Sequence, residues 1–98
     1  MKLPLQIRPQ AERDLTEARD WYSQQAPGLE VSFLSEVDVV FDRIQQNPHL
    51  YAAEHRSVRR ASLGRFPYIV YYRIDASSIE IIAVLHGSRH PHHWQSRS

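Results

Sequence analysis

The sequence contains no cysteine, which excludes disulfide bonds and thiolate metal ligands and is consistent with a reducing compartment. Its 98 residues include only three glycines and six prolines, too few for a disordered chain. No apolar run approaches the roughly 20 residues of a membrane-spanning helix, and the start of the chain lacks the apolar segment of a secretory signal. These absences predict one small domain, residues 1–98, that is soluble and cytoplasmic.

Lysine is almost absent as well, because Lys2 is the only one among twelve basic residues. Arginine presents a rigid planar fork that pairs bidentately with carboxylate or phosphate groups. The bias therefore favours specific pairing over diffuse attraction, although a genome that generally prefers arginine would produce it equally well. A glycine-rich phosphate loop, an HExxH zinc motif and a nucleophile elbow are all missing.

The net charge of +1 is unevenly distributed along the chain. Residues 1–54 carry five basic and nine acidic side chains, a balance of −4, whereas residues 55–98 carry seven arginines and two acidic residues, a balance of +5. Opposite signs in the two halves indicate that one surface suits an anionic partner.

The first half of the chain predicts a strand followed by two helices. Apolar residues alternate with polar ones from Leu3 to Ile7, as in a half-buried strand, and Pro4 suits the edge of a sheet. Helical periodicity then runs from Pro9 to the Pro-Gly pair at 27–28, and again over residues 29–46. The expected inward-facing residues are Ala11, Leu15, Ala18 and Trp21 or Tyr22 in the first helix, and Phe33, Val37, Val40 or Phe41, and Ile44 in the second.

The second half predicts three strands. They are a short one over residues 57–63 and two longer ones over 68–74 and 78–86, joined by the four-residue loop 75–78. The two longer strands are apolar on both faces and belong in the middle of the sheet. The expected fold is α+β, in the order β-α-α-β-β-β, with a helical hairpin packed on one face of a small, mostly antiparallel sheet and the other face left open.

Five arginines of the basic half come from the three C-terminal strands and their ends. In an antiparallel sheet these positions can converge on one face or rim and bind phosphate or a carboxylate-rich peptide. A solvated sheet surface with ordinary ion pairs is the alternative. The five are Arg59, Arg60, Arg65, Arg73 and Arg89.

The C-terminal tail combines histidines with one tryptophan. His86 ends the last predicted strand, where a side chain can act as a general acid or base near neutral pH, and three more histidines follow by residue 93. No metal or other cofactor is expected, because no carboxylate or cysteine lies nearby and Pro91 interrupts the spacing of ligands. The tail predicts either a docking segment anchored by Trp94 or a cap on the sheet.

Four aromatic residues fall within the central strand region: Phe66, Tyr68, Tyr71 and Tyr72. They suit either a platform on which nucleic-acid bases stack or the packed core. In so small a sheet, core packing is the favoured interpretation.

Several segments together resemble the ParE toxins of the ParE/RelE superfamily. These segments are ARDWYSQQAPGLEVSFLSEVD, DRIQQNPHLY, RFPYIVYYRID and IEIIAVLHGSRHPHHW, and they cover nearly the whole chain. The resemblance implies a β-α-α-β-β-β fold and the role of toxin in a type II toxin–antitoxin module. It further implies a ParD-like antitoxin, whose C-terminal segment wraps around the toxin, and DNA gyrase as the target.

Under this resemblance the five arginines and Trp94 are expected to contact the antitoxin or the target. The RelE branch of the superfamily, which cleaves messenger RNA on the ribosome, would instead give Arg65 and His86 catalytic roles. Two departures weaken that reading, because no lysine pair precedes Arg65 and the tail contains no tyrosine. An inactive binding module of the same fold and a stand-alone nucleic-acid-binding domain are the remaining alternatives.

Overall fold

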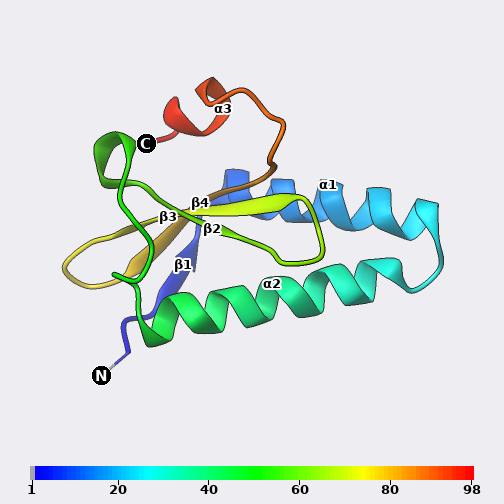
Figure 1. Ribbon diagram of the computed structural model, residues 1–98, viewed down its shortest axis with the longest axis horizontal. Helices are drawn as coiled ribbons and strands as arrows, with labels where there is room; N and C mark the ends of the chain where they lie inside the picture. The colour runs from blue at the N-terminus through cyan, green and yellow to red at the C-terminus, as the bar shows by residue number, and fades with distance from the viewer. Residues whose placement is uncertain (1) are drawn as a thin grey trace.

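The structure is a computed structural model that describes residues 2–98. Its elements in chain order are β1 (Leu5–Ile7), α1 (Pro9–Gln25), α2 (Leu29–Gln46), the single helical turn η1 (His55–Ser57), β2 (Arg59–Ser62), β3 (Tyr68–Ile74), β4 (Ile79–His86) and α3 (His92–Gln95). The predicted order β-α-α-β-β-β is confirmed, with two short helical segments added (Figure 1). None of the helices in the described part of the chain has the length and apolarity needed to cross a bilayer.

The four strands form one mixed sheet in the order β1-β4-β3-β2. β1 runs parallel to β4, whereas the other two pairings are antiparallel. β3 and β4 occupy the middle of the sheet, as predicted from their apolar side chains on both faces. β1 is an edge strand, in agreement with Pro4, which has no N–H to donate to a neighbouring strand.

α1 and α2 form a helical hairpin that packs on one face of the sheet (Figure 1). Gly28 permits the short connection between them, because its φ of 88° lies in the left-handed region that other residues avoid. The buried residues of the hairpin pack against Val70, Tyr72, Ile79 and Ile81 of the sheet. From the two helices these are Ala11, Ala18, Tyr22, Phe33, Val37, Val40 and Ile44.

One position on α1 differs from the predicted stripe, and the choice left open between Trp21 and Tyr22 is settled in favour of Tyr22. Asp14 is only 8% exposed, whereas Leu15 is half-buried. Trp21 is 53% exposed and Tyr22 takes the inward position. A carboxylate tolerates the inward position only when charged or N–H groups compensate its lost hydration, and such partners are present at Asp14.

The aromatic residues around the start of β3 belong to the core, as favoured above. The rings of Phe66 and Tyr68 pack edge-to-face on Phe33, with centroid separations of 5.5 and 5.3 Å. Tyr72 is fully buried and its hydroxyl donates a hydrogen bond of 2.6 Å to the carbonyl oxygen of Pro48. These rings therefore pack against other core residues and are not available to stack on nucleic-acid bases.

The second face of the sheet has its own small apolar cluster, which a β-bulge helps to build. Tyr71 lies opposite Ala83 and Tyr72 opposite Ile81, so Ile82 is the extra residue in β4. Ile82 and Ala83 therefore both contribute to the second face. The cluster consists of Val58, Ile69, Tyr71, Ile82, Ala83, Leu85 and Trp94.

The prediction that this second face is open is wrong. After β4 the chain turns back, and α3 lies over this face of the sheet (Figure 1). Trp94 of α3 packs on the cluster with 4% of its surface exposed. The indole stacks on the Tyr71 ring, with centroids 4.8 Å apart and planes 19° apart. The tail covers this face because the bulge and the flanking strands place apolar side chains there, and burial of apolar surface is favourable.

Candidate functional site

β2 presents its two arginines to opposite faces of the sheet, because successive side chains alternate along a strand. Arg59 lies on the helix side, where its guanidinium donates a hydrogen bond to the carbonyl oxygen of Tyr51. Arg60 lies on the second face, where its guanidinium carbon is 5.7 Å from the centre of the Tyr71 ring and its Nη1 is 3.5 Å from Glu54 Oε2. Arg60 is thus exposed but already has one acidic neighbour.

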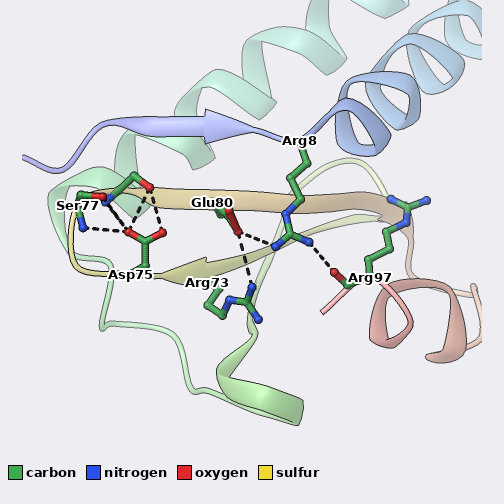
Figure 2. A network of polar contacts seen from close by, with 7 residues as sticks. Arg8, Arg73, Asp75, Ser77, Glu80 and Arg97 are labelled. Carbon is green, nitrogen blue, oxygen red and sulfur yellow. Dashed lines mark hydrogen bonds and ion pairs between the residues drawn. The ribbon is translucent and has the colours of Figure 1, made fainter.

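Arg73 belongs to a network of charges on the second face (Figure 2). Its Nη2 lies 3.7 Å from Glu80 Oε1, and the same oxygen accepts a hydrogen bond of 2.7 Å from Arg8. Arg8 also donates a hydrogen bond of 2.5 Å to the backbone carbonyl of Arg97 in the tail. Two guanidinium groups therefore share one carboxylate, and Arg8 connects the sheet with the tail.

Arg65 lies in the loop between β2 and β3, beside α2. Its backbone N–H donates a hydrogen bond of 2.6 Å to Glu36 Oε1, and its Nε lies 3.3 Å from Glu36 Oε2. The Arg65 side chain is nevertheless 71% exposed. Because exposed ion pairs contribute only about 0–1 kcal/mol, this guanidinium remains available to a partner.

Arg89 follows β4 and borders a cleft of about 200 Å³ between α1 and the ends of β3 and β4. The rings of Tyr68 and His86 pack edge-to-face there, with centroids 5.5 Å apart. Burial raises the pKa of Tyr68, and the nearby positive charge of Arg89 opposes that rise. Arg89 forms no ion pair with any acidic group of residues 2–98.

His86 also lines a second hollow, of about 480 Å³, together with Arg65. The His86 Nδ1 accepts a hydrogen bond of 3.1 Å from the backbone N–H of Ser88. In the neutral ring this assigns the proton to Nε2. The structure thus brings together the two residues to which the RelE resemblance gives catalytic roles.

The five arginines do not form one continuous patch. Arg65 and Arg89 lie at the end of the sheet where β3 begins, since Tyr68 pairs with His86 there. Arg59, Arg60 and Arg73 lie toward the other end, in the registers that place Arg60 opposite Tyr71 and Arg73 opposite Glu80. Their roles as contacts for an antitoxin or a target stay predictions.

An ion pair between the tail and α1 was not predicted from the sequence. Asp14 Oδ2 accepts a hydrogen bond of 3.0 Å from the backbone N–H of Val84 and one of 2.6 Å from Arg97 Nη1. The pairing of β1 with β4 ends at Ile81, so the backbone N–H of Val84 has no acceptor on β1. The Asp14 carboxylate provides that acceptor. The available signal was a carboxylate three residues after Ala11 and four before Ala18, within the apolar stripe of α1.

Of the two predicted roles for the tail, the structure shows the cap on the sheet. Trp94 is buried against Tyr71, as described above, and its ring also lies 6.1 Å from that of His55. Burial raises the pKa of Tyr71. Contact of Trp94 with a partner stays a prediction.

The histidines of the tail do not gather around a common point. His90 Nδ1 accepts a hydrogen bond of 3.1 Å from the backbone N–H of His92. Within residues 2–98, no three histidine, aspartate or glutamate side chains are placed to hold a metal ion together.

Known proteins are similar to this chain in sequence and in fold. Residues 5–91 match the family described as "ParE toxin of type II toxin-antitoxin system, parDE". Toxin ParE2 of Mycobacterium tuberculosis is 35% identical over 88 residues, which cover 89% of this chain and 84% of the relative. A solved structure described as "Chromosomal ParDE TA system from P. aeruginosa" has the same fold, with a TM-score of 0.77 at 21% identity over 87% of this chain and 96% of that chain. The chain therefore belongs to the ParE toxins of type II toxin–antitoxin systems.

Proposed function

We propose that this ParE toxin binds and inhibits DNA gyrase, and that a cognate, ParD-like antitoxin neutralises it. The observation that carries the proposal is the family match, which extends over residues 5–91 and so includes both long helices and all four strands. Inhibition of gyrase is the activity implied by the resemblance to ParE toxins. An antitoxin partner is further supported by the P. aeruginosa structure, which is described as a ParDE system.

Exposed arginines are the chemical groups that suit this function. Arg65 and Arg89 are both exposed at the same end of the sheet, where their planar forks can pair with carboxylate or phosphate groups. An acidic antitoxin segment that occupies these groups excludes the target by competition. Toxicity then results from binding, without a reaction catalysed by the toxin itself.

Supercoiling of relaxed plasmid DNA by purified gyrase tests the proposal. We expect the chain to reduce supercoiling and to cause linear cleaved DNA to accumulate, and we expect the antitoxin to restore supercoiling. Reversal of charge in the double variant Arg65→Glu, Arg89→Glu is expected to abolish antitoxin binding or gyrase inhibition. The control is Arg19→Glu, which changes an exposed arginine of α1. Unchanged behaviour of the double variant in both assays would contradict the assignment of these arginines.

A ribosome-dependent messenger RNA endoribonuclease is the second candidate, because Arg65 and His86 line the same hollow. In such a reaction His86 would exchange a proton with the ribose or the leaving group, and Arg65 would stabilise the phosphorane. Primer extension on ribosome-bound messenger RNA distinguishes the two. Cleavage that disappears in Arg65→Ala and His86→Ala would replace the gyrase assignment, and inactivity of the native chain in both assays would identify an inactive binding module.

A further inference from the structure

The segment that leads into β2 makes a tight turn with an unusual backbone. Arg56 has φ 51° and ψ 41°, Ser57 has φ 64°, and the backbone N–H of Val58 donates a hydrogen bond of 3.0 Å to the carbonyl of His55. Two consecutive positive φ angles closed by such a bond are the pattern of a type I′ turn. These turns favour asparagine and glycine, because other side chains crowd the backbone in the left-handed region. Arg56 and Ser57 are therefore both strained.

Contacts of the residues on both sides of the turn hold its backbone in place. Val58 is fully buried in the apolar cluster of the second face, and the His55 ring lies edge-on to that of Trp94. On the incoming side, the backbone N–H of Glu54 donates a hydrogen bond of 2.7 Å to the carbonyl of Val58. The surroundings thus fix the strained conformation, while the Arg56 side chain stays exposed.

Residues 54–60, the basic turn, carry an excess of positive charge. Three arginines lie within these seven residues, and Glu54 is the single acidic residue among them. Arg60 pairs with Glu54 and Arg59 bonds to the carbonyl of Tyr51. Arg56 forms no ion pair with any acidic group in the described part of the chain.

We propose that the basic turn is a docking site for the acidic segment of the antitoxin, and that Arg56 is the contact which the strained turn presents. The identity of this partner rests on the function proposed above. Backbone strain persists where the surroundings enforce it, and it concentrates at binding and switch regions. Because the turn fixes the backbone that carries Arg56, pairing of this residue with a carboxylate costs less conformational entropy than pairing from a mobile loop would. The net charge of only +1 favours an acidic polypeptide over nucleic acid as the partner.

Two glycine variants of the full chain, Arg56→Gly and Ser57→Gly, separate strain from recognition. Each replaces one strained residue by the amino acid that adopts a positive φ without a steric penalty, so both are expected to raise Tm by a few degrees. Only Arg56→Gly removes the guanidinium. Titration calorimetry with the purified antitoxin is expected to show about a tenfold loss of affinity for Arg56→Gly at 50 mM salt, and no loss for Ser57→Gly. The loss should shrink at 500 mM salt, because ions screen the contact.

Each contrary result has a distinct meaning. Equal antitoxin affinities for the two glycine variants would overturn the role of Arg56, and a Tm that neither variant raises would overturn the strain on which the inference rests. An effect of Arg56→Gly on the binding of duplex DNA, but not on that of the antitoxin, would also overturn it. Gyrase inhibition is measured separately, so a chain that binds antitoxin through Arg56 without inhibiting gyrase would support this inference while contradicting the proposed target.

Discussion

A single carboxylate joins three parts of the chain that are distant in sequence. Asp14 belongs to α1, its N–H partner Val84 to β4 and its guanidinium partner Arg97 to the tail. The Asp14 carboxylate is almost completely buried, and the Arg97 side chain is 22% exposed. Removing one member of such a group leaves the others without partners in a poorly hydrated place, which costs more than the loss of one exposed ion pair.

We expect Asp14→Ala to lower the free energy of unfolding by about 2–4 kcal/mol, because it leaves the Val84 N–H without its partner and the Arg97 guanidinium without its carboxylate. Asp14→Asn should cost less, since its amide oxygen still accepts a hydrogen bond. Urea unfolding followed by circular dichroism measures both. Arg13→Ala, on the exposed side of α1, is the control and should change stability by less than about 0.5 kcal/mol. Equal stabilities of Asp14→Ala and the control would contradict the structural role of this carboxylate.

Burial raises the pKa of Tyr72 to about 12, and the positive charge of Arg59 only partly opposes this rise. Below pH 10 the phenol is protonated in both states, so its ionisation does not change the stability. Between pH 10 and about 12 the unfolded chain loses the proton while the folded chain keeps it. The free energy of unfolding therefore falls with rising pH, by roughly 1.4 kcal/mol per pH unit from this residue.

The variant Tyr72→Phe tests this pH dependence. It should cost about 1 kcal/mol at pH 8, because the hydrogen bond to Pro48 is lost, and it should lose less stability than the native chain between pH 10 and 11.5. Urea midpoints over that range provide the measurement. Parallel pH profiles of the two proteins would show that Tyr72 is not protected from ionisation.

At the scale of elements, the tail completes the fold although α3 has only four residues. Trp94 covers the apolar cluster of the second face, and Arg97 anchors the chain end to α1. Without Trp94, the Tyr71 ring and its neighbours would face water. The tail therefore forms part of the folded domain.

Trp94→Ala is expected to destabilise the protein by about 3–5 kcal/mol, the usual cost of removing a buried aromatic side chain. It should also increase the fluorescence of an apolar dye, because the second-face cluster becomes exposed. His93→Ala, at the exposed neighbouring position, should leave both signals unchanged. A stable Trp94→Ala variant that does not bind the dye would show that the tail is dispensable for the fold.

The elements that sequence analysis predicted well are those with a clear period or a clear stop. The second helix extends over Leu29–Gln46 as predicted, because its apolar residues keep the helical spacing up to the Asn-Pro pair at 47–48. The four-residue loop 75–78 was also predictable, because it separates two apolar strands. By contrast, α3 is too short to show a period, and the extra residue of the bulge, Ile82, lies within an unbroken apolar run.

The candidate site was predictable as a set of residues but not as an arrangement. The resemblance to RelE enzymes pointed to Arg65 and His86, yet only the folded structure shows that both line one hollow. The strained turn at Arg56 gave no signal, because an Arg-Ser pair is not typical of a type I′ turn.

At the scale of the whole molecule, folding mixes the acidic and basic halves of the sequence. Three ion pairs join an arginine of the basic half to an acid of the acidic half, and they lie at different places on the structure. The pairs are Arg60 with Glu54, Arg65 with Glu36, and Arg97 with Asp14. Much of the +5 of residues 55–98 is thus compensated, and within the described residues of this half the positive charge without an acidic partner is left at Arg56, Arg59 and Arg89.

The central claim is that this toxin acts by binding gyrase and not by turning over a substrate. The most direct test is a titration of the supercoiling activity of a fixed amount of gyrase with the purified chain. An inhibitor that acts by binding should lower activity in proportion to the complex formed, reach a plateau once the gyrase sites are filled, and be reversed by an equimolar amount of antitoxin. Full supercoiling activity at micromolar concentrations of the chain would contradict the claim.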